Sequence, residues 1–505
     1  MNLYTIGSVT SSKTFSIQPI VGPEELLTSS QVAQRLVNDG RSPVAARQHI
    51  ARAARKRDVW RSSALQLPHR ERLIAHRSSV GSPKFLREAG ELLAKSRPGI
   101  SRCIAALLQH QVILKPDAER LLAVRNDEDY AREKRALQEI GILVAVDEGT
   151  ALERLSLSLF GDTRAKARLH YQRLVLGAQV ARVLVEHLRR QSIVSWGGNS
   201  FPEGPLRLAR FSGYTFTACG WSWLAPLLSW NQNKPSPTPV LLDVYPGDCD
   251  VFDVESHRAR LARVKGVNRK SQVLGVIAAY RFSKEAHRMA RNAGLMVINI
   301  KDVFGDAALD VLSQLGALLS SGAASADTSD SHAADVERVT TTIERLKDHP
   351  FVQDLRSLGL ETLSALLARV DGWEDVKVGI SVPFQRDSTR EVDVSGIAHG
   401  GRKALVVECK AHRADGPVAA EDVKKFFSET VPAFLRHNHS WQIEECSAEI
   451  WTTGSINDEA HAALQAVSMD RRVAPSLVNG DELARRIPAT LAPCRRLLRT
   501  IAEVR

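Results

Sequence analysis

The second half of the chain carries the same order of elements twice. In residues 240–300, apolar runs typical of buried strands alternate with segments of helical periodicity. Residues 404–461 repeat the order strand, helix, strand, helix, and the tripeptides Glu285-Ala286-His287 and Glu459-Ala460-His461 lie at the same point of the two orders. Because strands that alternate with helices form layered α/β domains, the sequence predicts two α/β domains related by internal duplication.

The length leaves room for further domains. The chain has 505 residues, and about 100 to 200 residues per domain predicts three or four domains. Hydrophobic residues make up 44% and charged residues 25%, which argues against wholesale disorder. A small, polar stretch without periodicity follows the middle copy and predicts a flexible linker. The expected divisions are an N-terminal region at 1–145, a middle α/β domain at 146–318, a linker at 319–338 and a C-terminal α/β domain at 339–505.

Positive charge is concentrated near the N-terminus. The formal net charge is +11, and residues 1–120 hold 19 Lys and Arg against 9 Asp and Glu. Lys and Arg neutralise phosphates and release their counterions, so this distribution favours a nucleic-acid-binding module. A solvated basic face without a partner is the alternative.

The same region contains a pattern of two helices joined by a tight turn. Residues 29–37 have helical periodicity, and Ser42 and Pro43 are typical of the start of a second helix. The apolar face of the second helix leaves its polar side chains pointing away from the core, where they could reach bases and phosphates. These candidate DNA-binding residues are Arg47, Gln48, His49, Arg52 and Arg55.

The pattern around these helices favours winged-helix domains. Residues 59–77 could form a wing, and helices at 83–95 and 100–110 indicate a second, weaker copy. Two-helix turns are also common in proteins that never touch DNA. The predicted fold class is therefore multidomain α/β plus α, with winged-helix-like domains in residues 1–145 followed by the two α/β domains.

Three charged residues flank a predicted hairpin in the C-terminal copy. Gly400-Gly401 suits a two-residue turn because both positions can take positive φ. A hairpin centred on that turn places Asp393 opposite Glu408, with Cβ atoms about 5 Å apart. Strand alternation puts Lys410 on the face of Glu408 and sends Cys409 to the other side.

Two carboxylates and an ammonium on one face of apolar strands point to a divalent cation. Mg²⁺ prefers a few carboxylate oxygens together with waters and phosphate oxygens. It activates a bound water for attack on phosphorus, and Lys410 would orient or help deprotonate that water and stabilise the transition state. We expect Mn²⁺ to substitute for Mg²⁺.

The sequence Arg390-Glu391-Val392-Asp393, followed by an apolar run and Glu408-Cys409-Lys410, resembles the PD-(D/E)xK nuclease superfamily in its Mrr-like and Holliday-junction-resolvase-like members. The resemblance covers about residues 340–485 and implies a restriction-endonuclease-like fold. It implies that Asp393 and Glu408 are metal ligands and Lys410 is the catalytic lysine. The glutamate that the family often carries on its first helix is best matched by Glu361, with Glu391 as an alternative. The family's proline before the aspartate is absent.

The middle copy departs from this pattern. Its central strand carries Asp243 and Tyr245 where Glu408 and Lys410 stand, so the lysine is missing. The resemblance then implies a degenerate restriction-endonuclease-like domain with a structural or DNA-holding role.

The resemblance implies a Mg²⁺-dependent DNA endonuclease acting in restriction or defence against foreign DNA. Double-stranded DNA would be the partner, with Arg390, His412 and Arg413 near the scissile phosphates. A homodimer is consistent with duplex cleavage, which needs two sites. No GxxxxGK[ST] motif occurs in the sequence, so ATP-driven movement would require an ATPase or another defence-system subunit.

Two alternatives stay open. A non-catalytic DNA-binding scaffold of a larger complex would hold metal or DNA at the same site without cutting. A structure-specific nuclease of repair or recombination would cut branched DNA.

The remaining features suggest a cytoplasmic location without a membrane partner. No run reaches the roughly 18 apolar residues of a spanning helix. The first residues lack the basic and apolar segments of a signal peptide. The six cysteines form no CxxC pair, so buried thiols are expected rather than a zinc ribbon or disulfides.

Overall fold

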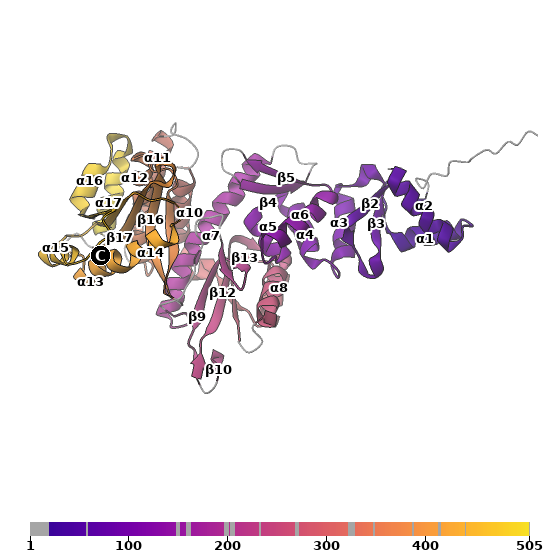
Figure 1. The fold of residues 1–505 in the computed structure, drawn as a ribbon, viewed down its shortest axis with the longest axis horizontal. Coiled ribbons are helices and arrows are strands. Elements are labelled where there is room, and N and C mark those ends of the chain that lie inside the picture. The colour runs from indigo at the N-terminus through magenta and orange to yellow at the C-terminus, as the bar shows by residue number, and fades with distance from the viewer. Residues whose placement is uncertain are drawn as a thin grey trace, which may run out of the picture. The chain divides into compact units, whose positions relative to one another are not determined.

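The structure is a computed structural model, and its helices and strands are drawn in Figure 1. Contacts divide the chain into two compact units. The first contains Met1–Val112, Asp127–Ala145 and Leu155–Thr163, and the second contains Ile113–Asn126, Val146–Arg154 and Arg164–Arg505. The structure describes residues 20–56, 59–147, 152–157, 163–195, 201, 208–231, 234–267, 272–321, 329–346, 349–385, 388–412, 416–439 and 441–503.

The first unit begins with the predicted pair of helices. Thr28 forms a capping box with Gln31, because its hydroxyl accepts from the Gln31 N–H at 3.3 Å and its own N–H donates to the Gln31 side chain at 2.7 Å. A three-stranded antiparallel sheet of order β1-β3-β2 adjoins the helices, and two of its strands lie where the wing is predicted. The elements are β1 Leu26–Thr28, α1 Ser29–Asn38, α2 Pro43–Lys56, β2 Trp60–Gln66, β3 Arg72–Ala75, α3 Pro83–Leu93, α4 Pro98–His110 and α6 Asp127–Glu139.

Helix α2 has the amphipathic character that the sequence predicts. Ala46, Ile50 and Ala53 are buried against α1, in a core that includes Val32 and Leu36. The opposite side of α2 is exposed. The helix therefore presents a polar face to solvent.

Four further short elements lie, along the sequence, at or near the points where the chain passes from one unit to the other. They are β4 Val112–Leu114, α5 Lys115–Leu122, β5 Ile142–Asp147 and β6 Leu152–Leu157.

The middle copy in the second unit is built on a four-stranded sheet of order β14-β13-β12-β9. Strands β12, β13 and β14 run parallel, and β9 is antiparallel to β12. The long helix α7 packs along β12 (Figure 1). The elements are α7 Arg164–Arg190, β7 Ala209–Phe211, β8 Tyr214–Phe216, β9 Ala218–Ser222, β10 Ser229–Asn231, β11 Lys234–Ser236, β12 Thr238–Cys249, α8 Val251–Val267, β13 Leu274–Phe282, α9 Lys284–Asn292, β14 Met296–Asn299 and α10 Ile300–Ser321.

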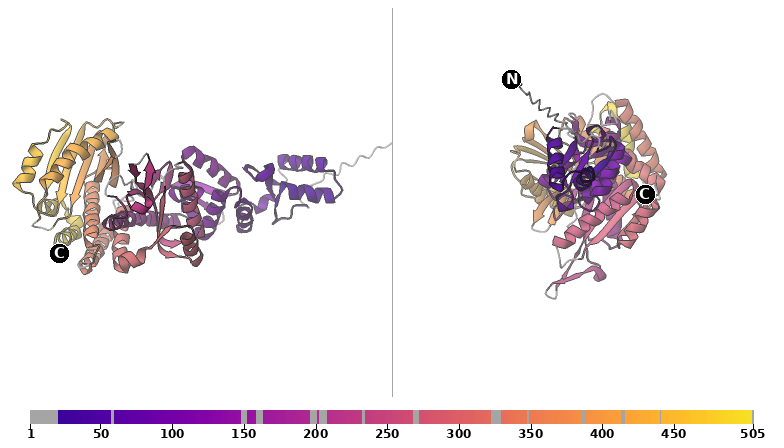
Figure 2. Two further views of the ribbon diagram at one scale, coloured as in Figure 1. Left: turned by 90° about the horizontal axis from the view of Figure 1, so that it is seen from below. Right: turned by 90° about the vertical axis from the view of Figure 1, so that its right-hand side faces the viewer.

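The C-terminal copy has a five-stranded sheet of order β15-β16-β17-β18-β19, whose strands lie side by side in Figure 2. The helical segment at 420–437 is continuous but contains a π-helical part at Phe426–Thr430, just before Pro432, which has no N–H to donate. The elements are α11 Ser329–Arg345, α12 Val352–Val370, β15 Lys377–Gln385, β16 Ser388–Ala398, β17 Lys403–Lys410, α13 Ala420–Lys425, α14 Val431–His437, β18 Glu445–Thr452, α15 Asp458–Gln465, β19 Val473–Val478, α16 Gly480–Arg486 and α17 Ala492–Glu503.

The two copies share strand topology and register, as the predicted duplication would require. In the parallel pairs, Asp243 lies beside Ile277 in the middle copy and Glu408 lies beside Ile450 in the C-terminal copy. Each central strand has an antiparallel neighbour on its other side, β9 or β16.

The helices that carry the two matching tripeptides are capped in the same way. The Ser283 hydroxyl accepts from the Ala286 N–H at 3.3 Å, and the Asn457 side chain accepts from the Ala460 N–H at 2.9 Å. Each alanine is the middle residue of its Glu-Ala-His tripeptide. The tripeptides therefore occupy the same turn of equivalent helices.

One hydrophobic cluster runs through both copies. It includes Val180 and Leu184 of α7, Leu312 of α10, Leu363 of α12 and Val407 of β17. The two copies therefore share a core and belong to one compact unit.

The predicted linker at 319–338 is largely helical, which corrects the expectation of a flexible segment. Helix α10 continues to Ser321 and α11 begins at Ser329, and residues 322–328 lie outside the described part of the chain. Val336 of α11 is fully buried in the shared core. The composition of small residues concealed this apolar face.

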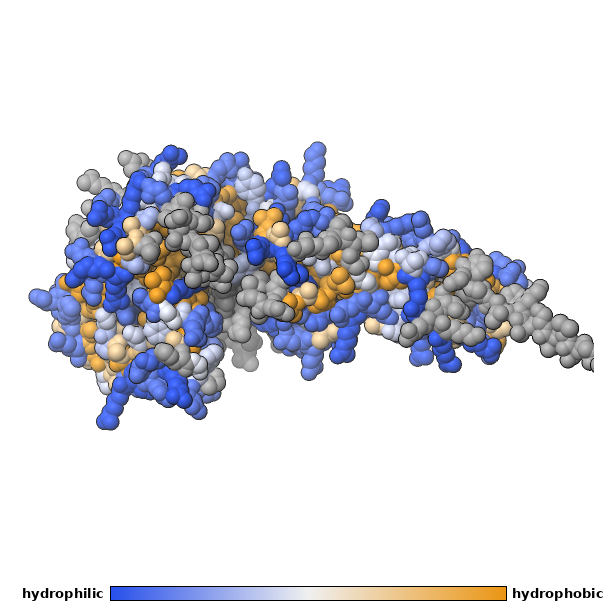
Figure 3. Space-filling view, turned by 90° about the horizontal axis from the view of Figure 1, so that it is seen from above, coloured by the Kyte–Doolittle hydropathy of each residue, from blue (hydrophilic) through white to orange (hydrophobic). Residues whose placement is uncertain are grey.

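The surface is predominantly hydrophilic on the face drawn in Figure 3, where apolar residues form small groups among polar ones. Within the described ranges, we find no helix with the length and apolar character needed to cross a membrane.

Candidate active site

The hairpin of β16 and β17 has the predicted register. Val394 pairs with Val407, and the pairs continue outward to Ala398 with Lys403. At the tip, Gly400 and Gly401 have φ values of 65° and 95°, a region that favours glycine. A Cβ atom on Gly401 would also collide with the ring of Trp441. The turn therefore fixes Asp393 and Glu408 at the same level of the two strands.

Asp393 and Glu408 are the two acids at the open end of this hairpin. The Asp393 carboxylate accepts a hydrogen bond of 2.7 Å from the Cys409 N–H. Lys410 lies 3.1 Å from a Glu408 oxygen and 3.6 Å from an Asp422 oxygen of α13. The structure thus brings together the three residues that the sequence selects and adds a fourth, Asp422.

Cys409 points to the other side of β17, as strand alternation predicts. Its sulfur lies 3.3 Å from the Ser364 hydroxyl on α12. Burial raises the pKa of the Cys409 thiol well above its usual value, so this cysteine is a packing residue.

Glu361 and Glu391 also belong to the site. Glu361 projects from α12 and is 6% exposed. Arg182 of α7 binds both acids, with Nη1 at 2.5 Å from Glu361 and Nη2 at 2.6 Å from Glu391. The first-helix glutamate expected from the resemblance is therefore at the site, but its carboxylate is paired with an arginine from the middle copy.

The carboxylates of the site are short of positive charge. Burial raises the pKa of Asp393 well above its usual value, and the charges of Glu408 and Glu361 raise it further. Burial also raises the pKa of Glu408, with Lys410 acting in the opposite direction. The pKa of Lys410 is raised despite its burial, because Glu408 and Asp422 stabilise the ammonium form. Such crowding of acids is what an additional cation relieves.

The donor set of Asp393 and Glu408 fits a single Mg²⁺ ion. Mg²⁺ is commonly held by one or two carboxylates and keeps several waters. Within the described ranges, no group of three or more His, Cys, Asp or Glu side chains is arranged as a ligand set. Metal binding by Asp393 and Glu408 stays a prediction.

The three residues predicted to contact the scissile phosphates differ in their surroundings. Arg390 pairs with Glu429 at 2.8 Å and stacks on the Phe384 ring at 4.2 Å. His412 is half-buried beside Lys410, and burial lowers the pKa of its ring. Arg413 lies outside the described residues. Their contact with DNA stays a prediction.

The candidate recognition face of α2 is described within the first unit alone. His49 is partly buried, and its Nδ1 lies 3.5 Å from an Arg41 nitrogen. The other four candidates, Arg47, Gln48, Arg52 and Arg55, are exposed.

The middle copy has a closed polar cluster where the C-terminal copy has its acids. Asp243, His257 and Arg260 are each fully buried. Asp243 is bound by Arg260 at 2.5 Å, by His257 at 2.7 Å and by the Thr217 N–H at 3.2 Å. Burial alone would raise the pKa of Asp243, but Arg260 and His257 hold it well below its usual value. This acid is fully compensated by the protein itself, which supports the prediction of a structural role.

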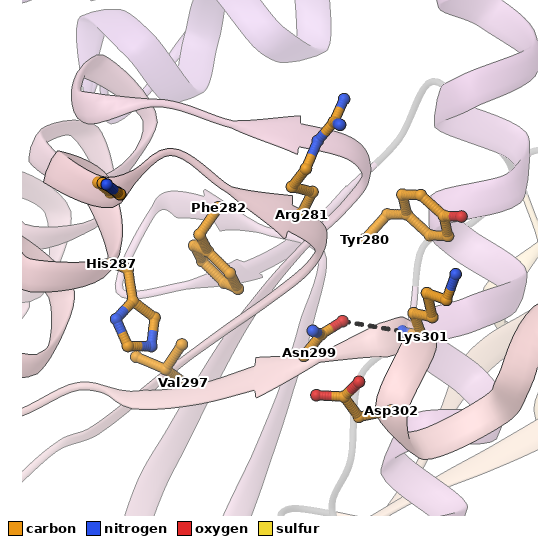
Figure 4. A pocket seen from close by; sticks show the side chains of 9 residues that line it. Tyr280, Arg281, Phe282, His287, Val297, Asn299, Lys301 and Asp302 are labelled. Carbon is orange, nitrogen blue, oxygen red and sulfur yellow. Dashed lines mark hydrogen bonds between the residues drawn. The ribbon is translucent and has the colours of Figure 1, made fainter.

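A groove of about 750 Å³ opens in the middle copy at the carboxyl ends of β13 and β14 (Figure 4). Three cations line it, Arg281, Lys284 and Lys301. Arg281 pairs with Asp248 at 2.8 Å and Lys301 with Asp306 at 2.9 Å. His287 packs edge-on against Phe282.

Sequence reasoning missed Arg182 and Asp422. A usable signal existed for Arg182, which lies between the buried residues Ala181 and Val183 on a helix of the core. Arginines are rarely buried without a partner, so one in such a segment indicates a carboxylate nearby. Asp422 has no comparable local signal, because acids are common in the first turn of a helix.

Comparisons with known proteins identify no family. No family model matches the chain, and no curated protein matches it. Two solved structures are similar to part of it. The EndoMS–dsDNA2 complex matches with 12% identity and a TM-score of 0.17, over 31% of this chain and 59% of the other. EndoMS in apo form matches with 12% identity and a TM-score of 0.15, over 31% of this chain and 58% of the other. The chain thus spans less than two thirds of these proteins, and similarities of this size carry no argument about it.

Proposed function

We propose that this protein is a divalent-metal-dependent DNA endonuclease whose active site lies at the open end of the β16–β17 hairpin. The observation that carries the proposal is the convergence of Asp393, Glu408 and Lys410. Their acids are short of positive charge, and their lysine is held between two carboxylates. In a hairpin with a purely structural role, these partly buried charges would lower stability without serving a function.

The chemistry expected of the site is hydrolysis of a phosphodiester bond. Asp393 and Glu408 would hold Mg²⁺ or Mn²⁺, and the ion supplies an activated water and neutralises phosphate charge. Glu408 and Asp422 keep the Lys410 ammonium near the acids. There it would donate a hydrogen bond to the water or to a phosphate oxygen and stabilise negative charge in the transition state.

DNA as the substrate is supported by charge and by the first unit. Most of the excess of Lys and Arg lies in residues 1–120, and α2 presents exposed arginines on one face. Helices of this kind bind in the major groove and contact phosphates. A role in restriction or defence against foreign DNA is inferred from the resemblance to the PD-(D/E)xK superfamily.

The test is cleavage of supercoiled plasmid at low salt by the purified full chain, with Mg²⁺, Mn²⁺ or EDTA. We expect metal-dependent nicking or linearisation by the wild type. The Asp393→Ala and Lys410→Ala variants should lose about 10² to 10⁴-fold in rate while still binding DNA. The matched control is Lys403→Ala, at the other end of β17 in an ion pair with Glu445, which should cleave normally.

The outcomes separate the alternatives. If the wild type binds DNA but does not cut under any of these conditions, the proposal is wrong and a scaffold role is favoured. Preferential cutting of branched over linear DNA would support a structure-specific nuclease of repair or recombination rather than a restriction enzyme.

A further inference from the structure

Arg182 connects the middle copy to the candidate active site. It is on α7, which packs along the central strand β12 of the middle copy, yet its guanidinium lies between Glu361 of α12 and Glu391 of β16. Each of its two terminal nitrogens binds a different carboxylate. The C-terminal site is thus completed by a side chain from the other half of the duplication.

The position of Arg182 is deeply enclosed. The exposed fraction is 17% for its side chain and 8% for that of Glu361. Gly379, which has a φ of 64°, lies against the guanidinium, and a Cβ atom there would come within 2.7 Å of it. The backbone of β15 has therefore left space for this arginine.

The charges around the site indicate what Arg182 does. Burial would lower the pKa of Arg182, but Glu361 and Glu391 raise it well above its usual value, so it stays a cation. Glu361 and Glu391 each use an oxygen on the guanidinium, whereas Asp393 and Glu408 have no arginine partner among the contacts of the described residues. Glu361 and Glu391 thus share a guanidinium, whereas the cation paired with the other two acids is the Lys410 ammonium on Glu408.

We propose that Arg182 takes the place of a second divalent cation, so that this active site binds one metal ion rather than two. The inference rests on the proposed function. Two-metal sites hold their ions about 4 Å apart between shared carboxylates, and the Glu361–Glu391 pair beside Asp393 is the set that a second ion would use. Arg182 is a positioning residue: it fixes the orientation of the two acids without touching the substrate.

The experiment counts bound Mn²⁺ on the metal-stripped full chain, by titration with electron paramagnetic resonance detection of unbound Mn²⁺. We expect Asp393→Ala to bind one ion fewer per chain than the wild type. Arg182→Ala should bind one ion more than the wild type, because Glu361 and Glu391 lose their guanidinium. Arg182→Lys, which keeps the positive charge, should match the wild type.

A matched control exists on the same helix. Arg190 of α7 pairs with Asp354 of α12, so Arg190→Ala also removes an arginine–carboxylate contact between these two helices. It should leave the number of bound ions unchanged. The thermal transitions of the variants show whether each one is folded.

The inference is overturned if the wild type exceeds Asp393→Ala by two ions, or if folded Arg182→Ala binds no more ions than the wild type. The first comparison decides even if Arg182→Ala does not fold. Plasmid cleavage is a separate readout. If the wild type binds one ion more than Asp393→Ala but does not cleave DNA, the nuclease proposal alone is overturned. If it binds two ions more and does cleave DNA, the one-ion proposal alone is overturned. A wild type that binds no more ions than Asp393→Ala would overturn both.

Discussion

At the scale of single residues, the two copies use an acid on the central strand in opposite ways. Asp243 is saturated by Arg260, His257 and a backbone N–H, whereas Glu408 faces other acids and a single lysine. The position of a carboxylate in the fold therefore does not decide its role. What decides it is whether neighbouring helices supply enough cations.

This contrast predicts that Asp243→Asn destabilises the second unit strongly. The change leaves the buried Arg260 without its counter-ion, and breaking a buried ion pair costs about 3–5 kcal/mol. The measurement is the free energy of unfolding in denaturant. The control is Asp248→Asn on the same strand, whose pair with Arg281 is exposed and worth about 0–1 kcal/mol. Equal losses in the two variants would contradict the assignment.

The stabilisation that the Asp243 carboxylate contributes should depend on pH. The pKa of Asp243 is lowered in the folded state, so its stabilisation is fully present above its unfolded pKa of about 4 and is lost as the pH falls below it. The stability difference between wild type and Asp243→Asn should therefore be constant near neutral pH and shrink on acidification. A difference that grows in acid would show that the carboxylate is not held in its charged form.

At the scale of elements, periodicity and caps predicted most helices and strands. The predicted helix at 83–95 corresponds to α3, and the Gly400-Gly401 turn set the register of β16 and β17. These signals are local. The linker prediction was wrong for α11 because small residues hide an apolar face that tertiary packing selects.

Helix α2 carries a prediction for DNA binding. If its exposed face contacts phosphates, Arg52→Ala and Arg55→Ala should each weaken binding to all sequences alike and reduce the salt slope by about 1. The measurement is the dissociation constant at several salt concentrations. Arg87→Ala, at an exposed position of α3 in the same unit, should change neither quantity. Equal effects at all three positions would indicate a diffuse basic surface.

At the scale of the whole molecule, the sequence predicted the duplication and the central residues of the site but not how the two copies meet. Asp393, Glu408 and Lys410 are linked by a short hairpin, so spacing alone locates them. Arg182 and Glu361 are far apart along the chain and lie on helices of different copies. No periodicity encodes such a contact.

The shared core predicts that the second unit survives a cut between its copies. A protease site placed within residues 322–328 and then cleaved should leave the two fragments associated. They remain joined by the core cluster and by contacts such as Phe304 with Phe351, whose ring centroids are 4.6 Å apart. Size-exclusion chromatography of the cleaved chain is the measurement, with a denaturing gel to show complete cutting. Fragments that elute separately would contradict the shared core.

The charge deficit at Asp393 and Glu408 also has a thermodynamic consequence. A ligand that binds only the native state raises its stability in proportion to the logarithm of ligand concentration, and the acids that attract the ion also repel one another in its absence. Metal availability would then set the folding equilibrium of the second unit as well as its chemistry. In metal-poor surroundings, the C-terminal copy would become the more easily opened half, and the internally neutralised middle copy would remain closed.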